Sequence, residues 1–226
     1  MNQEYFKVHK TKYKELIKDL THQLSRRNIN PKNLGNDLLL PFDQFTDQEI
    51  IQHLELLEKI INQYEILDPL ESKSNQLRSI ILHHGLVPID TSLFDRIEEE
   101  DLIEIIDLNT LTPLYRCMDS FGVTNYSIEE LLSYSPLVLF DRPSWVTTEI
   151  LKVAEDIKNE PRIIKMNHFP TYIMQETLSL KGDQYLITHK YMGPLVKMGD
   201  SRPSSVVSTF TIQKCNEDDS GDIRII

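Results

Sequence analysis

The stretch Ile105–Pro143 constrains the fold more than any other, because it predicts two strands, a capped helix and a helical turn in that order. Glu104–Asp107 is a short apolar run that ends in an acid, and Tyr115–Met118 mixes aromatic, aliphatic and cysteine side chains. Both runs have the length of a strand, and Leu108–Pro113 between them suits a turn. These residues therefore predict a β-hairpin.

A helix is predicted directly after this hairpin, from Ser127 onward. Ser127 and Glu130 have the spacing of a capping box, in which each side chain bonds the backbone amide of the other residue. Leu131 and Leu132 supply the apolar side of the helix. Pro136 ends it, because proline cannot continue a helix.

The rest of the C-terminal half predicts one more helix and then strands. Ser144 is placed to cap an amphipathic helix over Trp145–Lys158. Met192–Ser204, with its glycines and prolines, predicts a long loop, and Gly182-Asp183 predicts a turn. Three strand candidates follow, by composition or alternation: Arg162–Asn167 together with Tyr172–Leu180, then Gln184–Tyr191, and last Val206–Lys214.

Asp107 and the segment Tyr126–Leu131 resemble the opening of a PAS domain, a small sensory module. The resemblance implies an α+β protein in which an N-terminal helical region precedes a PAS-like five-stranded antiparallel sheet with flanking helices. It also implies that Val206–Lys214 closes this sheet and that the helix Trp145–Lys158 covers the ligand pocket. On this interpretation residues 95–215 form the sensory domain.

Residues 1–90 predict a helical region with a role in dimerisation or signal transfer. Gln3–Arg27 carries an apolar stripe, and a second capping box at Thr46 and Glu49 begins a helix that ends near Leu67. Five residues of that helix follow the heptad spacing of a coiled coil: Ile50, Leu54, Leu57, Ile61 and Tyr64. Either these side chains are buried in a local helical bundle, or they form the seam of a homodimer.

A third helix is predicted over Leu70–Leu82, with Gly85 as its left-handed C-cap. We place the domain boundary near Val87–Arg96 and expect the acidic tail, residues 216–226, to be frayed.

The 226 residues suffice for one large or two small domains, and the formal charge of −11 opposes attraction to phosphate backbones and anionic membranes. We therefore expect no direct binding of nucleic acid by this segment and no membrane association. Two cysteines and the lack of a long apolar span indicate a reduced, cytoplasmic protein. The usage of lysine, asparagine and isoleucine is compatible with a bacterial source.

The common phosphate-binding, dinucleotide-binding, hydrolase and zinc motifs do not occur in the sequence, so we expect a protein that is not an enzyme. The alternative is a small enzyme that uses the face of His168 and His189 with Asp183 or Glu176. His83-His84 lacks further ligand residues nearby, and we expect no metal site there.

A ligand pocket between the sheet and its covering helix is expected to draw on seven residues: Cys117, Trp145, His168, Tyr172, Met174, Tyr185 and His189. Alternatively, bulky side chains fill this space and leave no cavity. The PAS resemblance implies a histidine on the covering helix if a haem is bound, and Trp145–Lys158 contains none. It implies a cysteine in the preceding turn if the protein is a flavin photoreceptor, and Tyr134–Phe140 contains none. Both cofactors are thus disfavoured, and the cofactor stays unknown.

The expected function is a PAS-type sensor or interaction module that binds a small ligand or a protein partner. Such a module passes the change to an output domain or a downstream signalling partner, for instance in transcription regulation. The chain is then either the input part of a longer protein or a protein that binds another one. A dimeric structural adaptor without a ligand is the alternative, and function does not follow from the fold.

Overall fold

The structure is a computed structural model that describes residues 3–31, 45–110, 113–133, 139–178 and 182–215. The predicted acidic tail and most of the connector Leu38–Phe45 lie outside these ranges. The chain divides into two compact units, here called the helical unit (Met1–Ser72 and Met118–Leu139) and the sheet unit (Lys73–Cys117 and Phe140–Ile226). The division that we predicted near Val87–Arg96 remains a prediction.

The helical unit contains four helices among its described residues. They are α1 (Gln3–Ser25), α3 (Asp47–Glu65), α5 (Ser120–Val123) and α6 (Ile128–Ser133). Both predicted capping boxes are confirmed: the Glu49 carboxylate accepts a hydrogen bond from the Thr46 backbone, and that of Glu130 accepts one from the Ser127 backbone, at 2.7 and 2.8 Å. In return the two cap hydroxyls accept from the backbone N–H groups of the glutamates.

Helices α1 and α3 pack against each other through apolar side chains. From α1 these are Tyr13, Ile17, Leu20 and Leu24, which are all buried. At the end of α3 the Arg27 guanidinium donates to the backbone oxygens of Tyr64 and Leu67, at 3.2 and 2.5 Å. A cation near the C-terminus of a helix interacts favourably with the helix dipole and with the carbonyl oxygens there.

The heptad positions of α3 are buried inside the chain. Ile50, Leu54, Leu57, Ile61 and Tyr64 are each at most 6% exposed. Of the two arrangements that the spacing allowed, the described residues therefore show the buried helix. A homodimer remains a prediction, but this row of side chains is already occupied by contacts within the protomer.

The sheet unit begins with α4 (Lys73–His83) and a 3-10 helix, η1 (Thr91–Arg96), and a longer helix, α8 (Ser144–Asn159), comes later in the chain. Gly85 has a φ of +64° just after α4, as predicted for the C-cap. Ser144 does not cap α8: it is the first helical residue, Pro143 holds the cap position, and no side chain caps the helix.

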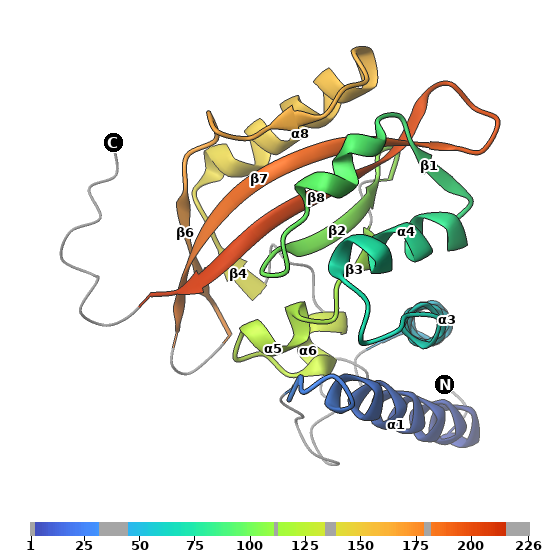
Figure 1. The fold of residues 1–226 in the computed structure, drawn as a ribbon. Coiled ribbons are helices and arrows are strands. Elements are labelled where there is room, and N and C mark those ends of the chain that lie inside the picture. The colour runs from blue at the N-terminus through green and yellow to red at the C-terminus, as the bar shows by residue number, and fades with distance from the viewer. Residues whose placement is uncertain (1–2, 32–44, 111–112, 134–138, 179–181, 216–226) are drawn as a thin grey trace. The chain divides into compact units, whose positions relative to one another are not determined.

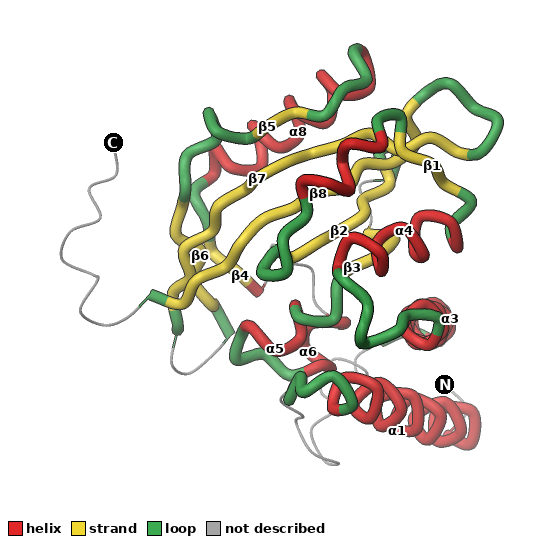
Figure 2. The backbone as a smooth tube through the Cα atoms, in the orientation of Figure 1, coloured by secondary structure: helices red, strands yellow, loops and turns green. Residues whose placement is uncertain are grey.

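The described residues of the sheet unit contain eight strands of one sheet (Figures 1 and 2). Their bounds are β1 (Leu86–Pro88), β2 (Leu102–Asp107), β3 (Pro113–Arg116), β4 (Phe140–Asp141), β5 (Ile164–Lys165), β6 (Tyr172–Glu176), β7 (Gln184–Lys197) and β8 (Pro203–Lys214). The order is β3-β2-β8-β7-β6-β4, with β1 and β5 also paired to β7, and all these pairs are antiparallel. The mixed class of helix and antiparallel sheet is thus confirmed.

Strands β7 and β8 form a long hairpin that is the centre of the sheet (Figure 2). The predicted loop Met192–Ser204 is wrong for most of its length, because β7 continues to Lys197 and β8 starts at Pro203. Gly193 and Pro194 suggested a loop, but the glycine at position 193 is explained by close packing within the strand. A Cβ at residue 193 would be only 2.9 Å from Cδ1 of Leu93 in η1.

A bulge at Lys190 sets the two faces of the sheet. His189 pairs with Phe210 and Tyr191 with Thr209, so Lys190 is an extra residue in β7. Directly paired residues share a face, which places Tyr172, His189 and Phe210 on the side here called the α8 face. Gly193 and Leu195 lie on the opposite side, the η1 face, against which Leu93 packs.

We predict that Leu57→Ala destabilises the protein by about 3 kcal/mol, because it leaves a cavity where a buried side chain stood. Leu56→Ala is the matched control: Leu56 is 41% exposed, so its loss should cost less than about 1 kcal/mol. Chemical denaturation followed by circular dichroism measures both. Equal losses for the two variants would contradict the packing of α3 described above.

Candidate functional site

Five rings gather on the α8 face of the sheet. Trp145, in the first turn of α8, contacts the rings of Phe169 and Tyr172 at centroid distances of 5.5 and 6.0 Å. His189 lies between three of them, 5.0 Å from Phe169, 5.9 Å from Tyr172 and 5.6 Å from Phe210. The cluster joins α8 to β6, β7 and β8. We call it, with the polar groups described next, the His189 site.

Polar groups are set among these rings. The Tyr172 hydroxyl lies 3.3 Å from Nε2 of His189. Arg142 lies between β4 and α8, and its positive charge lowers the pKa of both side chains. Glu104 on β2 forms an ion pair with Arg116 on β3 at 2.7 Å, and both side chains are mostly covered. The negative charge of Glu104 also raises the pKa of both His189 and Tyr172. The site therefore combines an apolar platform with several ionisable groups.

Two buried nitrogens of this site have no hydrogen-bond partner among the described residues, Nδ1 of His189 and Nε of Arg142. Buried polar atoms in native proteins nearly always have a partner, which is either a protein group or an ordered water. These two nitrogens belong to one cluster of side chains, so a single bound group could serve both of them.

The environment keeps His189 neutral and Tyr172 protonated. Burial lowers the pKa of His189 to about 4; the Glu104 charge opposes this shift and the Arg142 charge adds to it. Burial raises the pKa of Tyr172 to about 12, although the charge of Arg142 and its hydrogen bond to the hydroxyl act in the other direction. At neutral pH the site therefore offers an uncharged imidazole and an intact phenol.

The structure brings together three of the seven predicted ligand residues, Trp145, Tyr172 and His189. Met174 and Tyr185 pair on the same face further along, where the Tyr185 hydroxyl donates to Glu176 at 2.8 Å. His168 is exposed in the turn before β6. Cys117 is buried just after β3, and its Sγ accepts a hydrogen bond from the Ile103 backbone at 3.2 Å.

Four residues of the site were missed from the sequence: Glu104, Arg116, Arg142 and Phe210. Glu104 carried a usable signal, since it interrupts the apolar run of Leu102–Ile106. Arg142 and Phe210 carried none, because their position depends on strand pairing that no local pattern specifies.

The groups proposed for an enzyme are engaged elsewhere. Glu176 is buried and accepts from Tyr185, while the Asp183 carboxylate pairs with the ammonium of Lys214. Of the two histidines, His189 lies on the sheet and His168 is exposed to solvent. This arrangement brings neither Asp183 nor Glu176 to the His189 imidazole.

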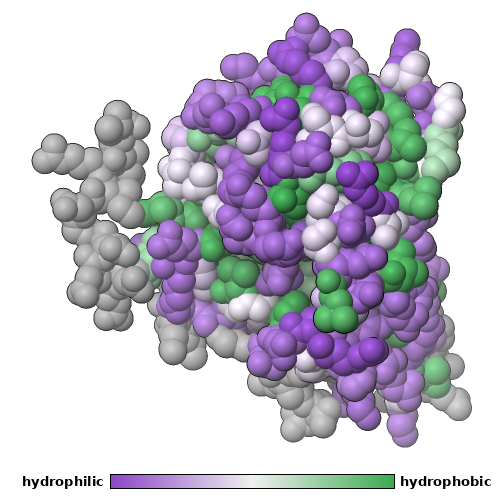
Figure 3. All heavy atoms as spheres, viewed as in Figure 1, coloured by the Kyte–Doolittle hydropathy of each residue, from purple (hydrophilic) through white to green (hydrophobic). Residues whose placement is uncertain are grey.

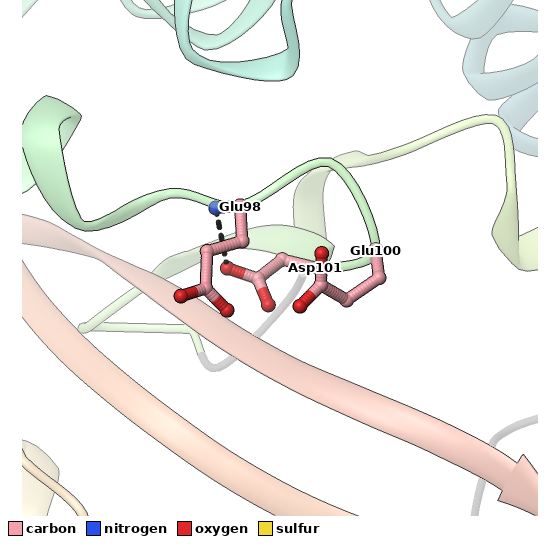
Figure 4. Close-up of side chains that lie close together, drawn as sticks. All are labelled: Glu98, Glu100 and Asp101. Carbon is pink, nitrogen blue, oxygen red and sulfur yellow. Dashed lines mark hydrogen bonds between the residues drawn. The ribbon is translucent and has the colours of Figure 1, made fainter.

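A second cluster consists of three carboxylates in the loop before β2. Glu98, Glu100 and Asp101 converge, with the Glu98 backbone N–H donating to Asp101 at 3.0 Å (Figure 4). The Lys190 ammonium lies among them, at 2.5, 3.4 and 2.6 Å from the respective carboxylate oxygens. Lysine thus supplies the positive charge that such a group of acids requires, and the cluster is an ion-pair network.

Lys190 remains charged in this network. Partial burial alone would lower its pKa, but hydrogen bonds and charges from Asp101 and Glu98 outweigh burial and raise the pKa above its ordinary value. Asp101 is completely buried, so its carboxylate depends on this cation. The network ties the bulge of β7 to the start of β2.

On the face drawn in Figure 3, hydrophobic residues of the described ranges lie among hydrophilic ones, as on ordinary protein surfaces. Among the described residues, no helix has both the length and the apolar character needed to cross a bilayer. Comparisons with protein-family models, with curated proteins and with solved structures give no match.

We predict that Lys190→Met destabilises the protein by about 2 kcal/mol or more, because it leaves the Asp101 carboxylate buried without a cation. Lys152→Met, at an exposed ion pair with Glu149, should change stability by less than about 0.5 kcal/mol. Adding Asp101→Asn to Lys190→Met should recover part of the loss. Thermal and chemical unfolding measure all three; no difference between the two lysine variants would contradict the role of the network.

We also predict that the His189 imidazole titrates near pH 4 in the folded protein. An unfolded histidine takes up its proton near pH 6.5, so this residue contributes stability that is complete above that pH and is lost as the pH falls toward 4. Site-resolved NMR is the suitable measurement, because burial also lowers the pKa of His53 to about 4. A His189 midpoint at or above 6.5 would contradict the environment described.

Proposed function

We propose that this chain is a non-enzymatic, PAS-type sensor that binds a small ligand at the His189 site. The observation that carries the proposal is the pair of buried, unpaired nitrogens of His189 and Arg142 within a cluster of aromatic rings. A bound small molecule would supply their partner and would cover the apolar platform at the same time.

The arrangement of the strands supports the proposal. The five strands expected from the PAS resemblance, β2, β3, β6, β7 and β8, are contiguous in the order β3-β2-β8-β7-β6. The last of them, β8, pairs along the whole of β2, as expected for a strand that closes the sheet. The three further strands are short additions, paired to β6 or β7.

Helix α8 is the element through which occupancy would be transmitted. Its Trp145 touches Phe169 and Tyr172, two rings of the site, and its apolar side lies on β7 and β8. The unpaired nitrogens are covered in the structure, so a ligand enters only if a covering group moves. A ligand that prefers the moved arrangement shifts the population of α8 positions, and an output domain or a partner protein in a signalling or transcriptional pathway reads that shift.

Native mass spectrometry of the protein as purified, beside its denatured mass, tests the proposal. We expect an added mass that disappears on denaturation, that is lost in His189→Ala and that is kept in His168→Ala, because His168 is exposed. Trp145 is the only tryptophan, so its fluorescence gives a second readout of occupancy in the same variants. A protein without added mass whose Trp145 emission also does not respond to extracts of small molecules would contradict a ligand sensor.

A further inference from the structure

Both unpaired nitrogens of the His189 site are hydrogen-bond donors. The Nε of arginine can only donate. The interaction of Arg142 with the Tyr172 hydroxyl lowers the pKa of that group, and an arginine can act there only as a donor. The Tyr172 hydroxyl hydrogen is then available for Nε2 of His189, 3.3 Å away. A neutral imidazole that accepts at Nε2 carries its hydrogen at Nδ1, the atom without a partner.

The charges of the site also favour a ligand that accepts hydrogen bonds from these two donors. Arg142 and Glu104 are the charged groups that act on His189 and Tyr172, and Glu104 is itself ion-paired with Arg116 on β3. No ion pair of Arg142 occurs among the described residues, so its guanidinium is the cation that an anion could neutralise. Two donors and a surplus cation in a poorly hydrated place favour an anion with two acceptor oxygens.

The aromatic rings indicate that the rest of the ligand is apolar. Trp145 and Phe210 are half-buried, so part of their apolar surface is open to a ligand, and the buried Phe169 ring lies between Trp145 and His189. A purely inorganic anion would leave this surface uncovered. An organic acid would satisfy the donors with its charged end and the rings with its body.

We propose that the His189 site binds a small organic carboxylate. Its oxygens accept hydrogen bonds from Arg142 Nε and His189 Nδ1, and its apolar body lies against Trp145, Phe169 and Phe210. This inference rests on the proposed function, since it names the class of ligand for the same site. It differs from a water-filled site, in which one buried water accepts both hydrogen bonds.

Matched acids and amides test the class of ligand on the full chain. Benzoate and phenylacetate are titrated beside benzamide and phenylacetamide, which have nearly the same shape but no charge. Trp145 fluorescence and the indole N–H signal of Trp145 report binding. We expect the acids to bind at least about tenfold more tightly than their amides, as a charge-assisted bond to Arg142 requires.

Arg142→Gln should weaken binding of the acids about tenfold or more and should leave the amides nearly unchanged. Arg162→Gln, at an exposed arginine of the same unit, is the control and should bind the acids as the unaltered protein does. If Arg142→Gln does not fold, as judged by circular dichroism, the comparison of acids with amides in the unaltered protein decides alone.

Three outcomes would overturn the inference. Amides that bind as tightly as the acids would show a site for neutral ligands, and the sensor function would survive. Binding of inorganic phosphate in place of the carboxylates would also refute the carboxylate class while leaving a sensor. Absence of binding for all five probes would indicate a water-filled site; only a further absence of any added mass in native mass spectrometry would refute the sensor function as well.

Discussion

The extra residue at Lys190 in β7 is the constraint on which the sheet unit depends. Side chains alternate between the two faces of a strand, so one inserted residue exchanges the faces for everything that follows it. Without it His189 and Gly193, four positions apart, would share a face. With it, His189 lies with Tyr172 and Phe210 beneath α8, while Gly193 lies beneath Leu93 of η1.

The same residue is held in place by its side chain and its backbone. The Lys190 ammonium lies among Glu98, Glu100 and Asp101, its carbonyl accepts from Met166, and the neighbouring Tyr191 N–H donates to the Thr209 hydroxyl. A bulge costs ladder hydrogen bonds, and these contacts replace them. The three acids therefore act in the architecture of the sheet, and the group proposed to face a ligand lies one residue earlier, at His189.

Local rules predicted the elements whose signals are local. The capping boxes at Thr46 and Ser127 are present with both of their hydrogen bonds, and the left-handed Gly85 ends α4. The continuation of β7 through Met192–Lys197 was missed because Gly193 and Pro194 are usually loop residues. Their tolerance in a strand comes from Leu93 above Gly193 and from pairing to β8 and β1, which no window of sequence contains.

The rings of Trp145, Tyr172 and His189 could be predicted for the candidate site, whereas the ring of Phe210 and the charged groups could not. Tyr172 and His189 were expected on the sheet and Trp145 on the covering helix, because aromatic residues in alternating strands and amphipathic helices meet across a core. Arg142 follows a strand of only two residues, and its approach to Tyr172 depends on the pairing of β4 with β6. Long-range pairing of this kind decides which polar groups meet, and it also decides which of them are left without a partner.

The tautomer of His189 is the most direct test of a hydrogen-bond chain that runs from Arg142 through Tyr172 to His189. The ¹⁵N chemical shifts of the imidazole distinguish a hydrogen at Nδ1 from one at Nε2. We predict that the neutral ring of the ligand-free protein carries its hydrogen at Nδ1, so that the chain ends on a free donor. A hydrogen at Nε2 would reverse the chain, leave an acceptor at Nδ1 and contradict a site built for an anion.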